Sequence, residues 1–259
     1  MTATRHTTTP EEGDAARVPF GRRDVDPSEK ATLVGQIFTN VAGRYDLMND
    51  LMSAGIHRLW KRSMIAALDL RPGAHLLDLA GGTGDIALRA FDLPAAPDVT
   101  VCDINPAMVR EGRDRSWNRG IVRGPNWTCG DAEALPFDDS SFDACTIAFG
   151  MRNVTHINRA LDEIRRVLKP GGQFLCLEFS PRVAPGLEGL YDAFSYRLIP
   201  AIGQAVTGDR AAYEYLVESI RRFPDPDRLA KMIADAGFAG IRVHPYTGGV
   251  AVLHAAWRI

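Results

Sequence analysis

Apolar positions along the chain follow two different periodicities, separated by polar stretches. Residues 1–19 are polar, rich in threonine and without periodicity, which indicates a flexible N-terminal tail. Apolar residues then recur at helical spacing from a start near Pro27, and we expect residues 20–70 to form an N-terminal helical cap. The apolar face of its first helix consists of Leu33, Val34, Ile37, Phe38 and Val41.

A second pattern begins after residues 71–73 (RPG), where short apolar runs alternate with amphipathic helical segments. One helix is expected to start at Asn105-Pro106, because asparagine suits the N-cap and proline the first helical position. Another is expected to be capped by Thr155 and to end at residues 169–172 (KPGG). The expected strands are residues 75–80, 99–103, 127–129, 142–149 and 173–179. Apolar strands separated by helices predict a parallel sheet with helices on both faces.

Residues 182–227 interrupt this alternation and are too many for an ordinary loop. We expect a helical insert, whose aromatic and aliphatic residues either pack into the core or form a wall for an apolar substrate. A helix over residues 227–236 and strands over 240–246 and 249–258 complete the chain. These elements predict a single α/β domain over residues 20–259.

Composition and charge exclude several classes of protein. The 30 Lys and Arg residues nearly balance the 32 Asp and Glu residues, giving a net charge of -2, so the basic excess of a nucleic-acid binder is missing. No run approaches the roughly 18 apolar residues of a membrane span, and the N-terminus lacks the apolar region of a secretory signal. The four cysteines form no CxxC pair, which argues against a metal site and fits buried thiols in a reducing cytoplasm.

The clearest ligand-binding signal is the loop of residues 81–84 (GGTG), between the first expected strand and its helix. Glycines such as Gly81 and Gly82 let the backbone approach a ligand, and the amides of the loop favour polar or anionic groups. Asp103 ends the second strand at the spacing of a ribose-binding acid, and Asp78 either accepts from a ligand ammonium or braces the loop. The loop also fits a loose dinucleotide pattern, so an NAD-type oxidoreductase remains open.

Further motifs favour S-adenosylmethionine (SAM) over NAD. Residues 130–137 (GDAEALPF), 141–143 (SFD) and 168–172 (LKPGG) follow the glycine loop in order. As a set, these motifs over about residues 73–180 resemble those of class I SAM-dependent methyltransferases. The resemblance implies a Rossmann-like class I methyltransferase fold with a mostly parallel, seven-stranded sheet and SAM as co-substrate.

Further segments, some within residues 73–180 and some before or after them, narrow the resemblance to one family of methyltransferases. They are residues 45–53 (YDLMNDLMS), 55–61 (GIHRLWK), 149–154 (FGMRNV), 177–180 (LEFS), 215–220 (YLVESI) and 247–251 (TGGVA). Together they resemble the ubiquinone/menaquinone biosynthesis C-methyltransferases. The resemblance implies methylation of a ring carbon of a polyprenylated quinol, either 2-polyprenyl-6-methoxy-1,4-benzoquinol or demethylmenaquinol. It also implies SAM contacts at Thr83, Asp103, Asp131 and Ala132.

The expected chemistry needs a stabiliser for a quinol phenolate and a proton acceptor. Arg152 follows the fourth strand and is too basic to accept a proton, so we assign it to stabilising the phenolate or polarising a water molecule. Asn153 is expected to orient the quinol oxygen or that water, and Tyr45 to close over the site. The competing candidate bases are His57, His156 and His254.

The isoprenoid tail of such a substrate needs an apolar channel or the membrane itself. Residues 57–62 (HRLWKR) suit weak attraction to anionic lipid or a solvated helix face, so we expect a cytoplasmic protein that contacts the membrane peripherally. A quinone-biosynthesis complex is a further expected partner, in which a non-catalytic role stays open. Another small apolar methyl acceptor also remains open, and the sequence predicts no oligomeric state.

Overall fold

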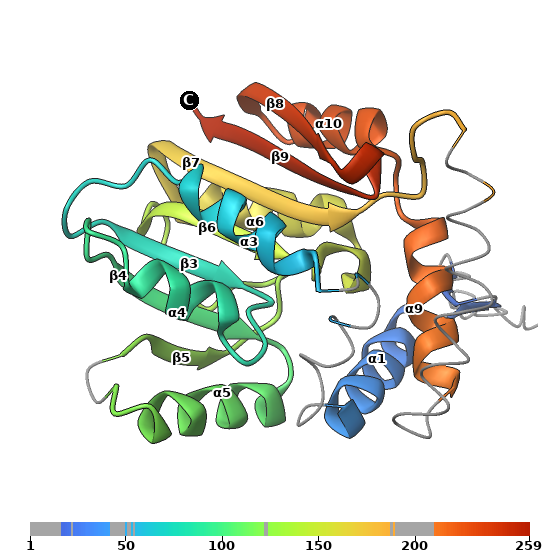
Figure 1. Cartoon of the computed structure of the whole chain (residues 1–259), viewed down its shortest axis with the longest axis horizontal. Coiled ribbons are helices and arrows are strands. Elements are labelled where there is room, and N and C mark those ends of the chain that lie inside the picture. Colours follow the sequence, from blue (N-terminus) through green and yellow to red (C-terminus); the bar gives the residue numbers. More distant parts are fainter. Residues whose placement is uncertain are drawn as a thin grey trace, which may run out of the picture.

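The computed structural model describes residues 17–21, 23–41, 50, 53, 55–121, 124–186, 189 and 210–259. In this part of the chain, seven strands form one sheet in the order β5-β4-β3-β6-β7-β9-β8, with helices on both faces (Figure 1). Neighbouring strands are parallel, except that β9 runs antiparallel to β7 and β8. The predicted α/β fold with a mostly parallel seven-stranded sheet is confirmed. The strands are β3 His75–Leu79, β4 Asp98–Asp103, β5 Asn126–Cys129, β6 Phe142–Ala148, β7 Leu168–Phe179, β8 Phe238–Tyr246 and β9 Ala251–Arg258.

Two helix starts show how far capping residues can be read from the sequence. The helix after β4 begins as predicted, because the Asn105 side chain accepts a hydrogen bond from the Ala107 amide. The predicted Thr155 cap is wrong. The residue before the helix is His156, whose amide donates to the Glu133 carboxylate from another loop. The helices are α1 Pro27–Val41, α3 His57–Ala66, α4 Asp85–Phe91, α5 Pro106–Asn118, α6 Ile157–Val167, α9 Arg210–Arg222 and α10 Pro226–Asp235.

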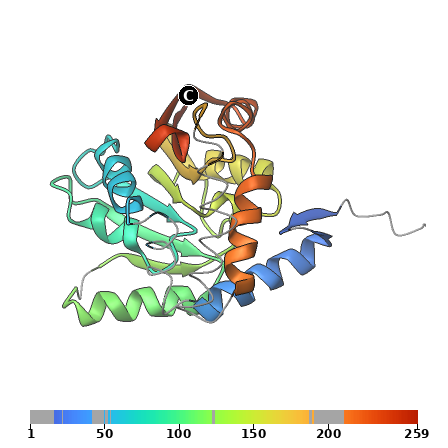
Figure 2. The ribbon, with the colours of Figure 1, turned by 45° about the vertical axis from the view of Figure 1, so that its right-hand side comes forward.

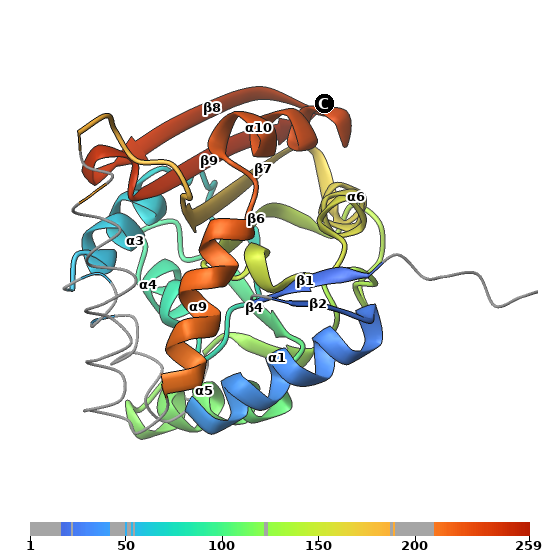
Figure 3. The ribbon, with the colours of Figure 1, turned by 90° about the vertical axis from the view of Figure 1, so that its right-hand side faces the viewer.

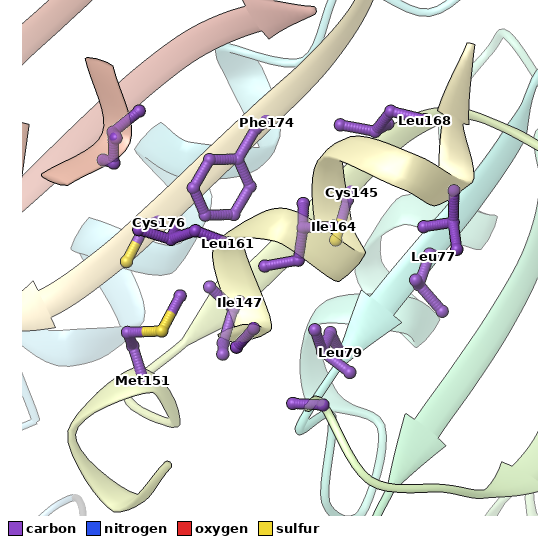
Figure 4. Packing of buried hydrophobic residues seen from close by; sticks show 14 of the residues in the cluster. Leu77, Leu79, Cys145, Ile147, Met151, Leu161, Ile164, Leu168, Phe174 and Cys176 are labelled. Carbon is purple, nitrogen blue, oxygen red and sulfur yellow. The ribbon is translucent and has the colours of Figure 1, made fainter. Parts of the chain in front are cut away.

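Side chains along the central strand β3 point alternately to the two faces of the sheet, which divides the core into two layers. Leu76 of β3 packs toward α3 and α4, whereas Leu77 and Leu79 point to the opposite face, toward α6 and α10. Figure 4 shows this second layer, in which apolar side chains of β3, β6 and β7 meet those of α6. Cys129 is exposed, contrary to the expectation that all cysteines are buried, because β5 is the edge strand of the sheet.

A short antiparallel hairpin precedes α1 and was not predicted. It comprises β1 (Val18–Phe20) and β2 (Arg23–Val25), so the predicted tail boundary at residue 19 lies inside it. The hairpin lies beside α1 and α9 (Figures 2 and 3). Within the predicted insert, α9 is helical as expected, while residues 187, 188 and 190–209 lie outside the described residues.

The predicted basic segment, residues 57–62, does not face outward as a unit. His57, Trp60 and Lys61 are buried, and the Lys61 ammonium group pairs with Asp85 at 2.9 Å. Arg58, Leu59 and Arg62 are exposed, so only one face of this segment is open to solvent or lipid, because the inward face of a helix takes every third or fourth residue. Among the described helices, none is long and apolar enough to cross a membrane.

Candidate active site

A pocket opens where the central parallel strands end. Its lining comes from the loops after β3, β4, β5 and β6 and from Val34 of α1. The chain turns in opposite directions from β3, toward β4 on one side and β6 on the other, so this edge is the switch point where such sheets bind ligands. We call it the strand-end pocket.

The glycine loop is held against the acid at the end of β4. The Gly82 amide donates to Asp103 Oδ2 at 2.8 Å, and the Asn105 amide donates to Asp103 Oδ1 at 2.8 Å. Gly82 adopts the left-handed conformation, with φ of 57°. Burial raises the pKa of Asp103, and the two donated hydrogen bonds oppose that rise. The loop and its acid therefore form one rigid unit.

Asp78 braces the loop from below. Its Oδ2 accepts from the Ala87 amide of α4 at 3.1 Å, and its Oδ1 accepts from the Thr146 hydroxyl of β6 at 3.0 Å. A Cβ atom on Gly81 would lie 2.8 Å from Asp78 Oδ2, so only glycine fits there. Both oxygens bind protein groups, which favours the bracing role over contact with a ligand ammonium. Burial raises the pKa of Asp78 to about 7.

The remaining predicted SAM contacts lie at the same edge of the sheet. Thr83 is buried within the glycine loop. Asp131 and Ala132 follow β5 and line the strand-end pocket, where Asp131 Oδ1 accepts from the Glu133 amide at 2.9 Å. The residues predicted to contact SAM therefore lie along one edge of the sheet.

Strain at two strand ends was not predicted. Ala80 after β3 and Phe149 after β6 both adopt positive φ, 48° and 59°, which non-glycine residues rarely do. A Cβ atom on Gly150 would lie 2.6 Å from that of Ala80, so the two loops approach closely beside the pocket. Backbone strain of this kind clusters at functional sites.

Arg152 lies in the single turn that follows β6, in a buried ion pair. Its Nη1 donates to Glu178 Oε2 at 2.9 Å and also to the Phe149 carbonyl, and its amide donates to Glu178 Oε1 at 3.1 Å. Its Nε and Nη2 are buried and have no partner among the described residues. These nitrogens form one edge of the guanidinium and are enclosed, so an oxygen reaches them only when neighbouring side chains move.

Asn153 lines the strand-end pocket, and its Oδ1 accepts from the Tyr215 hydroxyl of α9 at 3.2 Å. Burial raises the pKa of Tyr215 to about 12. Sequence reasoning missed Glu178 and Tyr215 as site residues. Both belong to segments that carried the family resemblance, but the sequence does not show that they meet Arg152 and Asn153.

The other predicted site residues either form hydrogen bonds away from the strand-end pocket or lie outside the described residues. Tyr45 lies outside the described residues. His57 Nδ1 lies 2.8 Å from the Ser53 hydroxyl, and burial lowers its pKa to about 4. His254 is buried against the Pro226 carbonyl.

Of the three histidines, His156 lies nearest the pocket. Its Nδ1 is 2.6 Å from Glu133 Oε2, and Glu133 itself lines the pocket. Among the described residues, no group of three His, Cys, Asp or Glu side chains could hold a metal ion.

The residues present fit SAM. Gly81 and Gly82 let a ligand approach the backbone of their loop, the acid after β4 suits a ribose diol, and the loop after β5 borders the pocket. The doubly wound sheet and this site define a class I SAM-dependent methyltransferase.

Comparison with known proteins identifies the family. The model of the ubiE/COQ5 methyltransferase family matches residues 26–258, and the chain belongs to this family. The ubiquinone/menaquinone biosynthesis C-methyltransferase UbiE of Bradyrhizobium diazoefficiens is 54% identical over 93% of this chain and 96% of that protein. The protein of the same name from Rhodopseudomonas palustris is 55% identical over 93% and 96%. The predicted resemblance is confirmed, and the NAD-type oxidoreductase is not supported.

Solved structures agree on the fold. A SAM-dependent methyltransferase from Thermotoga maritima, a possible histamine N-methyltransferase, superposes with a TM-score of 0.60 at 21% identity, covering 86% of this chain and 99% of that chain. At this identity the likeness shows the fold alone.

The raised pKa of Asp78 predicts a pH-dependent stability. Relative to the ordinary pKa of an aspartate, 3.8, a folded pKa of about 7 stabilises the fold at low pH, and this contribution is lost as pH rises through 7. Asp78→Asn can still accept from Ala87 and can donate to Thr146, without titrating. We expect its free energy of unfolding, minus that of the wild type, to rise between pH 5 and 7 by roughly 1 kcal/mol per pH unit. Urea unfolding across this range measures the difference, and a flat or falling difference would contradict the account.

Proposed function

We propose that this protein transfers the methyl group of SAM to a ring carbon of a polyprenylated quinol in ubiquinone or menaquinone biosynthesis. The observation that carries the proposal is identity of 54% over 93% of the chain to a protein named as a C-methyltransferase of that biosynthesis. The proposed acceptors are 2-polyprenyl-6-methoxy-1,4-benzoquinol and demethylmenaquinol. The strand-end pocket, with Asn153 in its wall and Arg152 beside it, supports a phenolic acceptor.

In this proposal the strand ends hold SAM, which supplies an electrophilic methyl group. Gly81 and Gly82 have no side chains, so the polar end of SAM can approach the backbone of their loop, beside Thr83. The Asp103 carboxylate has lone pairs left to accept from the ribose hydroxyls, beyond the two amides it already binds. Asp131 and Ala132 border the adenine, because they line the pocket after β5.

The acceptor carbon becomes nucleophilic when the neighbouring quinol hydroxyl loses its proton. Arg152 supplies a fixed positive charge that favours the phenolate, and its two unpartnered nitrogens supply donors when the site rearranges around substrate. Glu178 keeps that guanidinium in place at the end of β7. Asn153 binds the quinol oxygen directly from the pocket wall.

The isoprenoid tail makes the substrate a membrane component, so we propose that the protein works from the cytoplasm at the membrane surface, within reach of other quinone-biosynthesis enzymes. Flotation with anionic vesicles that contain the quinol tests this contact. We expect the protein to rise with vesicles, and protein that stays at the bottom with and without quinol contradicts it.

The direct test of function uses purified protein, SAM with a labelled methyl group and a short-chain benzoquinol. We expect label on a ring carbon of the extracted quinol, located by NMR. The matched control is the same compound kept oxidised as the quinone, which has no hydroxyl to ionise and should take up no label. Label on an oxygen, or none with the reduced acceptor, would overturn the proposal.

The role of Arg152 can be separated from its contribution to folding. Arg152→Gln alone leaves Glu178 buried without a charge partner, which costs about 3–5 kcal/mol. The double variant Arg152→Gln with Glu178→Gln removes both charges and keeps a neutral pair. We expect it to fold and to bind S-adenosylhomocysteine normally by calorimetry, while kcat falls by about 100-fold or more.

Glu178→Gln with Arg152 intact is the control for this pair, and it retains the positive charge. We expect its kcat to exceed that of the double variant. Equal turnover of the wild type and the double variant would exclude the role of Arg152.

A further inference from the structure

In the described part of the chain, the hydroxyl of Tyr215 makes one hydrogen bond. The side chain is buried, and Asn153 Oδ1 at 3.2 Å is the one acceptor that the described residues offer to its proton. A buried hydroxyl without an acceptor is costly, so Tyr215 donates and Asn153 accepts. Because burial raises the pKa of Tyr215 to about 12, the phenol keeps this proton at every ordinary pH.

This hydrogen bond decides which way the Asn153 carboxamide faces. With Oδ1 turned toward Tyr215, the Nδ2 group takes the other position and is left as a donor. The backbone of Asn153 is fixed as well, because its amide donates to the Gly150 carbonyl at 3.0 Å. The residue lines the strand-end pocket, which brings this donor within the neighbourhood of a bound substrate.

Tyr215 is itself held from the N-terminal side. The Phe20 ring of β1 packs against it at 4.7 Å between centroids. Arg222, two turns further along α9, donates to the Gly21 and Arg23 carbonyls at 3.2 and 3.1 Å and pairs with Asp24 at 2.8 Å. The hairpin and α9 thus form one unit beside the site, as Figure 3 shows.

We propose that Tyr215 is a positioning residue, which fixes the Asn153 amide so that its NH2 group donates to the reacting oxygen of the quinol, and that hairpin β1–β2 holds Tyr215 for this purpose. The inference rests on the proposed function. Without the Tyr215 hydroxyl, the amide can rotate and turn its oxygen toward the phenolate, which repels it. The chemical step then loses a donor while the SAM contacts on the other strand ends stay intact.

The test is a double-mutant cycle on kcat with the reduced quinol. Tyr215→Phe keeps the ring that packs on Phe20 and removes only the hydroxyl. We expect this change to lower kcat by about 5- to 10-fold, with the KM for SAM unchanged, as for a lost hydrogen bond. In the background of Asn153→Ala, the same change should lower kcat less than about 2-fold, because the group it positions is absent. Asn153→Ser replaces Asn153→Ala in the cycle if the alanine variant does not fold.

Tyr246→Phe is the matched control. It removes the hydroxyl of a half-buried tyrosine, which donates to the Ser63 hydroxyl at 2.7 Å. Neither residue lines the strand-end pocket, so kcat should be unchanged. Three results would overturn the positioning role. Tyr215→Phe could lower kcat equally in both backgrounds, it could lower kcat in neither, or the loss could be accompanied by a raised KM for SAM. No turnover by the wild-type protein would instead refute the proposed function and this inference with it.

Discussion

The buried ion pair between Arg152 and Glu178 is the interaction on which the site depends. Glu178 is the next-to-last residue of β7 and accepts from the backbone and side chain of Arg152 and from the Phe179 amide. Removing two charges from water is expensive, and the pair is tolerated because these hydrogen bonds satisfy the carboxylate. The pair therefore fixes the loop after β6 to the neighbouring strand and places a positive charge beside the pocket.

The other side of the pocket is fixed by carboxylates that bind backbone amides. Asp103 holds Gly82, and Asp78 holds the first turn of α4. Between these two fixed sides, Ala80 and Phe149 carry the strained turns at which β3 and β6 leave the sheet. A rigid glycine loop on one side and a positively charged loop on the other suit a reaction that requires precise alignment of two substrates.

Much of this arrangement could be predicted because it follows local patterns. The apolar strands, the Asn105-Pro106 start of α5 and the glycine loop with Asp103 each have a signature within about 20 residues. Arg152 and Asn153 were placed at the right edge because they follow a recognisable strand.

What the sequence could not show depends on partners far away in the chain. His156 rather than Thr155 precedes α6 because Glu133 binds it. Lys61 points inward because its ammonium group forms an ion pair with Asp85. The hairpin has strands of only three residues each, which are too short for a periodic pattern to be detected. The role proposed for Tyr215 depends on its contact with Asn153, 62 residues away.

The central claim is that this chain adds the ring methyl group of a respiratory quinone. It is tested most directly by the quinone profile of cells that lack the protein, analysed by mass spectrometry after solvent extraction. The account predicts accumulation of a polyprenylated quinol or quinone that lacks that one methyl group, and restoration by the wild-type gene. A normal quinone profile, or a precursor that lacks some other substituent, would contradict it.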